Sequence, residues 1–320
     1  MTNLLEAKGL SKAFPARDGK GVVNAVNDVS LTLAEGETLG IVGESGCGKS
    51  TLARMLLRLI EPSAGEVFFR GQNLLGLNRA EMRQRRRDIQ IVFQDPYASL
   101  DPRMKIADII AEPLDIHAIG SRAERVERVK DLLSLVGLDP SAGARYPHEF
   151  SGGQRQRIGI ARAIALEPTL LVLDEPVSAL DVSIQSQILN LLDDLKSRLN
   201  LSYIFISHDL SVVEHVSDRV AVMYLGRIVE QGPADVILTQ PRHPYTQALI
   251  SAVPEIEPER RKARTVLQGD LPSPENIPPG CAFHPRCPIA ADICKVQLPA
   301  FRSGGRSGVR CHLVEDPSIL

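Results

Sequence analysis

The sequence has little cysteine and no strong excess of charge of one sign. Five cysteines occur among 320 residues, and the formal net charge is −2. This balance gives no overall electrostatic attraction to nucleic acid or to an anionic membrane. Hydrophobic residues make up 43% and charged residues 24% of the chain, which is typical of a globular protein with a buried core.

Long hydrophobic runs and repeats are also missing. No stretch approaches about eighteen uninterrupted apolar residues, so the sequence predicts no transmembrane helix. The first residues, MTNLLEAKGL, lack the basic and apolar regions of a signal peptide. No internal repeat is evident, which favours one copy of the fold over a tandem pair. The simplest expectation is a cytosolic chain, in which structural disulfides are rare.

Strand and helix patterns alternate along the first two thirds of the chain. A helix is predicted over residues 49–60, directly after a glycine-rich turn. Strands are predicted within residues 1–42, at 90–94, and in the apolar runs TLLVLDEP and SYIFISHD, and a strand and turn are predicted at 66–75. Strands that alternate with helices predict an α/β domain with a mostly parallel sheet.

The region from Asp95 to Gly137 reads as helical. One apolar stripe is predicted there, with Gly137 as the C-cap of its helix. The members of that stripe are Val126, Val129, Leu132, Leu133 and Val136. After about residue 235 proline becomes dense and long periodic segments stop, so we place a domain boundary there.

A phosphate-binding pattern, GESGCGKST, occupies residues 43–51 after the apolar strand TLGIV. Its glycines let the backbone wrap round phosphate oxygens, and the N–H groups of the following helix favour anions. Lys49 can neutralise the β- and γ-phosphates of ATP, and the Ser50 hydroxyl can ligate Mg²⁺. Cys47 is read as a small residue that fits the turn. The residues expected to bind ATP in this loop are Gly43, Ser45, Gly46, Gly48, Lys49, Ser50 and Thr51.

An acidic pair follows a second buried strand. LLVLDEP places Asp174 and Glu175 at the carboxyl end of that strand, where doubly wound sheets carry their chemistry. Asp174 suits a Mg²⁺ partner, directly or through water. Glu175 suits the polarisation of an attacking water, so ATP hydrolysis is favoured over transfer to another substrate.

A second glycine turn, FSGGQRQR, spans residues 150–157. Ser151, Gly152 and Gly153 are expected to form another anion-binding turn at a helix N-terminus. One ATP does not need two such loops from one chain, whereas two facing chains would supply one each. At this point the sequence resembles the ATP-binding cassette superfamily, whose signature is LSGGQ, with Phe150 in place of the usual leucine.

Four further motifs extend the resemblance over residues 1–235. Gln94 in VFQDP is similar to the Q-loop, Asp181 in SALD to the D-loop, and His208 in FISHD to the switch histidine. Phe14 stands where an aromatic side chain usually stacks on adenine. The resemblance implies a P-loop NTPase fold with a RecA-like core, an antiparallel β subdomain and a helical subdomain at about residues 96–160.

The resemblance also implies a head-to-tail dimer with two ATP molecules at its interface. Glu175 would be the general base or position the water, His208 would contact the γ-phosphate, and Gln94 would sense the γ-phosphate and ligate Mg²⁺ with Ser50 and Asp174. The residues implied at ATP outside the loop of residues 43–51 are Phe14, Asp174, Ser151, Gly152, Gly153, Gln154 and Asp181.

Three phrases resemble the ATPases of oligopeptide/dipeptide importers: HPYTQALISAVPE, LPSPENIPPGCAFHPRC and AEPLDIH. That resemblance implies a second, related ATPase subunit, two permease subunits and a substrate-binding protein, with the ATPase at the cytoplasmic face of the inner membrane. Peptides are the favoured cargo, with nickel, glutathione, opines and oligosaccharides as alternatives. No nucleic-acid partner is expected, because the basic cluster MRQRRRD reads as a solvated helix face.

Two other functional classes stay open at the level of sequence. One is a soluble cassette ATPase that acts as a mechanical or regulatory switch without a membrane partner. The other is a metal sensor whose C-terminal tail regulates the cassette. Association with permeases would distinguish the first of these from an importer subunit.

Four of the five cysteines lie in the C-terminal extension, residues 236–320, with the spacing C-x5-C-x6-C-x16-C. Four thiolates can close a Zn²⁺ site or hold a [4Fe-4S] cluster. The importer resemblance favours the cluster at Cys281, Cys287, Cys294 and Cys311, with Zn²⁺ second and disulfides third. The neighbouring His284 and His312 could replace cysteines in a zinc site, although adjacent histidines are more often incidental. Such a metal would stabilise the fold of this extension, which has too few periodic apolar residues to form a core of its own.

Overall fold

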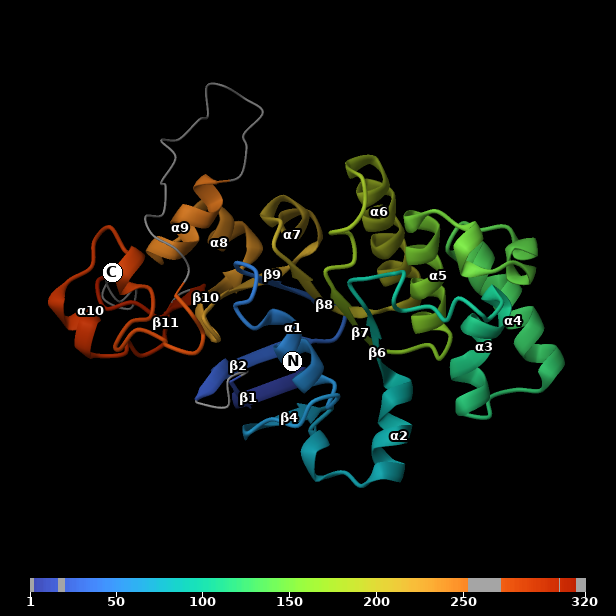
Figure 1. The fold of residues 1–320 in the computed structure, drawn as a ribbon, viewed down its shortest axis with the longest axis horizontal. Coiled ribbons are helices and arrows are strands. Elements are labelled where there is room, and N and C mark those ends of the chain that lie inside the picture. Colours follow the sequence, from blue (N-terminus) through green and yellow to red (C-terminus); the bar gives the residue numbers. More distant parts are fainter. Residues whose placement is uncertain (1–2, 17–20, 253–271, 305, 315–320) are drawn as a thin grey trace. The chain divides into compact units, whose positions relative to one another are not determined.

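The computed structural model describes residues 3–16, 21–252, 272–304 and 306–314. The chain folds into two compact units, Met1–Leu75 with Ser207–Leu320, and Gly76–Ile206 (Figure 1). The end of the phrase HPYTQALISAVPE lies outside the described residues. Within the described part of the chain, every helix is too short or too polar to cross a lipid bilayer.

The first unit contains an antiparallel sheet in the order β2-β1-β4-β5. Its strands are β1 (Asn3–Pro15), β2 (Val22–Ala34), β4 (Ala64–Phe69) and β5 (Gln72–Asn73). Apolar side chains that alternate along β2, such as Val29, Leu31 and Leu33, are buried on one face of the sheet. This confirms the strands predicted within residues 1–42. The strand and turn predicted at 66–75 are also present, as β4 and the turn at residues 70–71, and the short strand β5 follows them.

The same unit holds five strands of a second sheet, in the order β11-β12-β10-β9-β3. They are β3 (Thr38–Val42), β9 (Arg219–Tyr224), β10 (Arg227–Pro233), β11 (Arg302–Gly304) and β12 (Ser307–Val309). β3 runs parallel to β9 and is buried along its whole length, because helices and strands of this unit cover it. The tail joins this sheet where Val309 pairs with Glu230 of β10.

The helices of the first unit are short. They are α1 (Lys49–Leu56), α7 (Leu210–Val216), α8 (Ala234–Thr239), α9 (Pro244–Ser251), α10 (Asp292–Val296) and the 3-10 turn η5 (His284–Arg286). α1 starts where the sequence predicts and ends earlier than residue 60. Arg58 has a left-handed φ of 49°, which a continuing helix does not allow.

The second unit is built on a parallel set of strands in the order β8-β7-β6. These are β6 (Ile89–Val92), β7 (Leu170–Asp174) and β8 (Ser202–Ser207). β7 and β8 are buried at every position, which confirms the prediction of strands covered on both faces. The α/β class predicted from the alternating pattern is therefore confirmed.

Helices dominate the rest of the second unit. They are α2 (Arg79–Asp88), α3 (Ile106–Ile116), α4 (Arg122–Leu135), α5 (Gly152–Ile164), α6 (Val182–Leu199), η2 (Pro140–Ala144) and η3 (Pro147–Glu149), and the turn η1 (Leu74–Gly76) leads into the unit. α3 and α4 pack together and against α5 (Figure 1). This unit contains the whole segment, residues 96–160, that the sequence assigns to a helical subdomain.

Two details of the helical prediction are wrong. Residues 95–105 form turns, because the Asp95 and Asp101 carboxylates accept backbone N–H groups two residues ahead, from Tyr97 and Arg103. On α4, Val126 is 49% exposed, whereas the other members of the predicted stripe are buried. Val136 is the C-cap of α4, and Gly137 follows it with a left-handed φ of +73°, so the predicted glycine ends the helix one residue beyond the cap.

Candidate functional site

The loop between β3 and α1 can be made only with glycine at two positions. Gly43 has a φ of +153°, and a Cβ there would lie 2.2 Å from the backbone oxygen of Met223. Gly48 has a φ of +106°, and its Cβ would lie 2.0 Å from the backbone oxygen of Ala25. The neighbouring backbone therefore leaves room only for glycine at both positions, and the loop packs closely against its own unit.

Lys49 is the charged residue at the centre of this loop. Its side chain is buried, and its Nζ donates to the backbone oxygens of Gly43 at 2.8 Å and Glu44 at 3.1 Å. No side chain described in the structure caps α1 at Gly48. The first N–H groups of the helix therefore face the loop with their partial positive charge, next to the lysine. This is the arrangement of an anion-binding site.

The remaining loop residues divide between surface and interior. Ser45 and Gly46 are exposed, while Ser50 and Thr51 are half-buried in the first turn of α1. Cys47 is buried, and burial raises the pKa of its thiol. A protonated, inaccessible thiol is unreactive, which agrees with the interpretation of Cys47 as a small packing residue.

Two other predicted residues lie in the first unit. Phe14 is half-buried near the end of β1, opposite Val23 of β2, and the Lys12 ammonium lies 5.2 Å from its ring centroid. A ring partly open to solvent can stack on a base. His208 is exposed directly after β8, where Asp209 begins α7 by accepting the N–H of Ser211.

The second unit brings Gln94 and Glu175 together. The amide Nε2 of Gln94 donates to the carboxylate Oε2 of Glu175 over 2.9 Å. Glu175 has a left-handed φ of 48°, and its N–H donates to the backbone oxygen of Ile206 on the neighbouring strand. A strained residue that follows a buried strand is held there by its surroundings, which is common at functional sites. Asp174, one residue earlier, is buried at the end of β7.

The turn at residues 151–154 caps its own helix. The Ser151 hydroxyl accepts the N–H of Gln154, and the Gln154 side chain accepts the N–H of Ser151. A Cβ on Gly153 would lie 2.4 Å from Ile184 of α6, so this glycine allows α5 and α6 to pack closely. Ser151, Gln154 and Asp181, the residue before α6, are all exposed. They therefore form an accessible polar surface of the second unit.

The structure also reveals three residues that sequence reasoning missed, all centred on Glu44. The Glu44 N–H donates to the Tyr245 hydroxyl at 3.0 Å, and Arg286 donates to both carboxylate oxygens of Glu44 at 2.9 and 3.1 Å. Tyr245 and Arg286 lie in the phrases HPY and HPRC. An arginine between two cysteines is visible in the sequence as a candidate functional residue. The sequence does not show that its partner is Glu44, 242 positions earlier.

The HPY phrase has a clear structural role at the start of α9. The His243 Nδ1 accepts the N–H of Tyr245, and Pro244 occupies the first helical position, where its missing N–H costs nothing. The buried Glu230 carboxylate accepts the N–H groups of Arg242 and His243. Burial raises the pKa of Glu230, and burial lowers the pKa of His243 to about 3. The histidine is therefore neutral, as its capping role requires.

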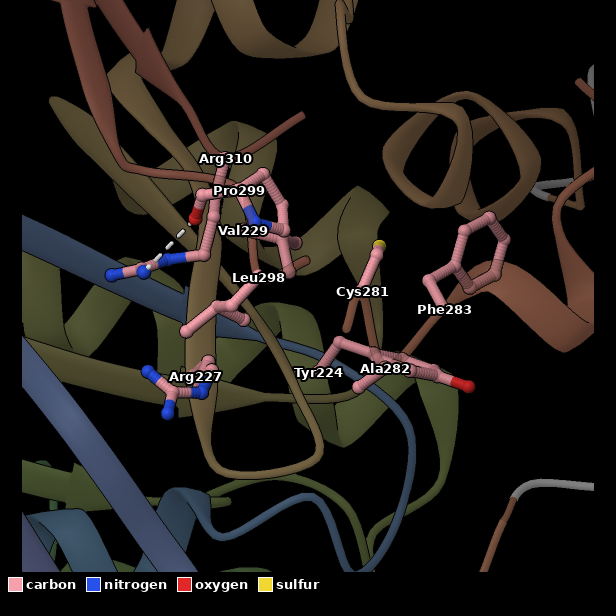
Figure 2. Close-up of a pocket in the computed structure, with 9 residues that line it drawn as sticks. All are labelled: Tyr224, Arg227, Val229, Cys281, Ala282, Phe283, Leu298, Pro299 and Arg310. Atoms are coloured by element: carbon pink, nitrogen blue, oxygen red, sulfur yellow. Dashed lines mark hydrogen bonds between the residues drawn. The ribbon is translucent and has the colours of Figure 1, made fainter. Parts of the chain in front are cut away.

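The four tail cysteines approach one another across separate segments. The pKa of the Cys281 thiol is raised to about 11, chiefly by burial and to a lesser extent by the neighbouring thiols of Cys294, Cys311 and Cys287. Figure 2 shows Cys281 in an apolar pocket that Phe283 and Leu298 also line, together with Arg310, which donates to the Pro299 backbone oxygen.

The metal site predicted for this tail is not supported by the geometry. Among the described residues, which include all four cysteines, no group of three or more His, Cys, Asp or Glu side chains is placed to hold a metal ion. Burial raises the pKa of the Cys281 and Cys287 thiols, and a bound metal would have to displace their protons. The two nearby histidines contact backbone oxygens instead, His284 that of Cys281 and His312 that of Gln297.

The predicted residues thus form two groups, one in each unit. The first unit holds the phosphate loop, Phe14 and His208, and the second holds Gln94, Asp174, Glu175, the turn at 151–154 and Asp181. Each group is consistent with the chemistry expected of it. In the first group, Lys49 and the N–H groups of α1 suit the binding of phosphate. In the second group, the Glu175 carboxylate, which accepts a hydrogen bond from the Gln94 amide, suits the orientation of a water molecule.

Comparisons with known proteins match two regions of the chain to protein families. Residues 26–178 match the ABC transporter family, and residues 229–294 match the oligopeptide/dipeptide transporter C-terminal region. The oligopeptide transport ATP-binding protein AppF of Bacillus subtilis is 53% identical over 97% of both chains. The di/tripeptide transport ATP-binding protein DppF of Pseudomonas aeruginosa is 52% identical over 98% of this chain and 99% of its own.

Solved structures give the same fold. The dimeric post-hydrolysis structure of the ATP-binding cassette MJ0796 with ADP and phosphate matches with a TM-score of 0.66 at 29% identity, over 72% of this chain and 98% of that chain. The structure of cbiO1 from Clostridium perfringens, part of the ABC transporter complex cbiONQ, matches with a TM-score of 0.64 at 28% identity, over 76% and 97%.

Proposed function

This chain belongs to the ABC transporter ATP-binding proteins of the oligopeptide/dipeptide type, and from this premise we propose that it hydrolyses ATP to drive the import of peptides. The observation that carries the proposal is the full-length similarity to AppF and DppF, which are named for peptide transport and share the C-terminal region as well as the cassette. Peptides are therefore favoured over nickel, glutathione, opines and oligosaccharides.

We assign the residue roles within each unit. Lys49 and the N–H groups of α1 bind the β- and γ-phosphates, and Phe14 stacks on the adenine ring. His208 contacts the γ-phosphate. The oxygen donors Ser50, Asp174 and Gln94 suit Mg²⁺, which prefers such ligands and would neutralise charge on the phosphates when bound.

Hydrolysis is assigned to the second unit. Glu175 accepts a proton from the attacking water or orients that water, and the hydrogen bond from Gln94 holds its carboxylate in place. The exposed turn at residues 151–154 and Asp181 act on the ATP of a facing subunit. The MJ0796 cassette, which is 29% identical to this chain, is dimeric, and a dimer is what this arrangement requires. By its resemblance to the importer family, the chain would work with permeases, a related second ATPase and a substrate-binding protein, at the cytoplasmic face of the membrane.

The tail cysteines are proposed to hold a [4Fe-4S] cluster, with Zn²⁺ as the alternative. The resemblance of the four-cysteine spacing to the importer family supports this, and no catalytic step depends on it. Iron, sulfide and zinc analysis of anaerobically purified protein tests it. Stoichiometric zinc without iron would contradict the cluster.

The function is tested with Glu175→Gln in a complex that contains the permeases. Loss of a general base lowers hydrolysis by roughly 10²–10⁴-fold, while ATP binding is kept because the phosphate loop is untouched. Peptide-stimulated phosphate release from the complex is the measurement, with a fluorescent ATP analogue for binding. Hydrolysis near the wild-type rate would remove Glu175 from the mechanism, and failure of the chain to co-purify with permeases would remove the transport function.

A further inference from the structure

Glu44, the second residue of the phosphate loop, is held through all three of its polar groups. Its N–H donates to the Tyr245 hydroxyl, its carboxylate accepts both terminal nitrogens of Arg286, and its carbonyl oxygen accepts the Lys49 ammonium at 3.1 Å. Two of these partners come from the C-terminal region. A continuous path of hydrogen bonds therefore runs from the tail through Glu44 to the phosphate-binding lysine.

The Arg286–Glu44 pair has the geometry of a strong interaction. It is bidentate, and the side chains are only 9% and 25% exposed. Burial alone would lower the pKa of Arg286, but the two hydrogen bonds to the Glu44 carboxylate raise it above its ordinary value, so the guanidinium stays charged. Paired charges shielded from water in a two-point contact are worth more than a surface pair. The tail's Arg306–Asp235 pair, with side chains 67% and 63% exposed, is a surface pair of that weaker kind.

The folding of the tail decides where Arg286 lies. The residue ends the short turn η5, between Cys281 and Cys287. Phe283, at the start of that turn, is buried, and its ring centroid lies 5.3 Å from that of Tyr224 and 5.5 Å from that of Tyr245. This aromatic cluster joins the part of the tail around η5 to β9 and α9. Arg286 can therefore reach Glu44 only when the part of the tail around η5 is packed against β9 and α9.

We propose that Arg286 is a positioning residue for the phosphate-binding loop, through which the C-terminal tail sets the affinity of this chain for ATP. The tail fixes the Glu44 side chain, and Glu44 in turn fixes the loop backbone and the oxygen on which Lys49 rests. A loop that is already ordered does not have to be ordered by the nucleotide, so it binds more tightly. The inference rests on the proposed role of this loop in binding ATP phosphates.

A simpler alternative is that the pair only fastens the tail to the unit. The two ideas predict different losses when the pair is broken. A fastener would change the stability of the tail and leave nucleotide affinity alone, whereas a positioning residue would change nucleotide affinity even when the tail stays folded.

The test measures the Kd of a fluorescent ATP analogue with Mg²⁺ for the full-length protein. We expect Arg286→Ala to weaken binding by about tenfold, which corresponds to about 1.4 kcal/mol. Arg286→Lys should recover part of this loss, because an ammonium keeps the charge but not the two-point contact. Arg306→Ala is the matched control in the same tail and should leave the Kd at the wild-type value.

A double-mutant cycle with Glu44→Gln isolates the pair from tail folding. Glu44→Gln leaves every tail residue intact and should weaken binding about as much as Arg286→Ala, and the double variant should be no weaker than either single variant. Tyr245→Phe, which removes only the hydroxyl, should give a smaller loss. Wild-type affinity in Arg286→Ala and Glu44→Gln, or losses that add in the double variant, would overturn the proposal.

Failure of the underlying function is separately visible. Lys49→Ala removes the lysine at the end of the path and should abolish nucleotide binding whatever the state of the tail. If Lys49→Ala binds like the wild type, the assignment of the loop to ATP is wrong. If only Arg286→Ala and Glu44→Gln bind like the wild type, the loop assignment stands and the role of the tail is wrong.

Discussion

The chain has two glycine-rich turns at helix N-termini, and they are built differently. In the loop of residues 43–51, backbone oxygens force Gly43 and Gly48, and no described side chain caps α1. In the turn of residues 151–154, Ser151 and Gln154 cap α5, and Gly153 makes room for a side chain of α6. The first turn has no side-chain cap at Gly48, which suits the binding of an anion by the first N–H groups of α1. The second satisfies itself and offers an exposed hydroxyl and amide, as a turn that meets a second chain would.

The largest expected effect breaks the first turn. Gly48→Ala places a Cβ against the Ala25 backbone oxygen at a positive φ, so the loop must move. We expect the affinity for ATP to fall by about 100-fold, or about 2.7 kcal/mol, in titrations with a fluorescent analogue. Gly46→Ala is the matched control: it shares a positive φ, but nothing described lies within 4 Å of its Cβ. Equal losses in both variants would show that the contact with Ala25 does not matter.

A smaller effect is expected when the second turn is overpacked. Gly153→Ala pushes a methyl group into Ile184, which costs about 1–3 kcal/mol of unfolding free energy. Urea unfolding should show this loss, and the additional change Ile184→Ala should return part of it. Binding of ATP to the isolated chain should not change. A loss of binding equal to that of Gly48→Ala would mean that both turns bind phosphate in the same chain.

The third effect develops only below neutral pH and concerns how the first turn is supported from α9. Burial lowers the pKa of His243 from 6.5 to about 3. The unfolded chain therefore takes up a proton that the folded chain refuses, so stability is full above pH 6.5 and falls by about 1.4 kcal/mol per unit as the pH drops towards 3. Glu230, whose pKa is raised by burial, acts in the opposite direction above its ordinary pKa.

Comparison with His243→Asn isolates the histidine, because asparagine can still cap Tyr245 and does not titrate. Urea unfolding at about pH 5 and pH 8 should show a flatter pH dependence in this variant than in the wild type. Ser151→Ala, at the second turn, is the control and should lower stability by about 1 kcal/mol at both pH values. Equal pH slopes in wild type and His243→Asn would mean that the histidine does not contribute.

Much of the local structure was predictable because it depends on near neighbours. β3, the loop and α1 follow from an apolar run, glycines at fixed spacing and a helical pattern, and Gly137 follows from the end of a stripe. The prediction that Val126 is buried failed because its exposure depends on which elements cover α4. The periodicity of the sequence carries no information about those elements. Residues 95–105 failed because the Asp95 and Asp101 side chains compete with helical hydrogen bonds.

The sequence by itself determined the kind of chemistry. The order of the phosphate loop, Gln94, the turn at 151–154, Asp174–Glu175 and His208 identifies an ATPase, since each motif is a short stretch whose residue types dictate a function. Only the tertiary structure decided how the loop is supported. Glu44 meets Tyr245 across 201 positions and Arg286 across 242, and such a pairing depends on how β9, α9 and the tail pack around one aromatic cluster. Long-range packing of this kind leaves no periodic pattern in the sequence, which is why the link between the tail and the loop appeared only in the folded chain.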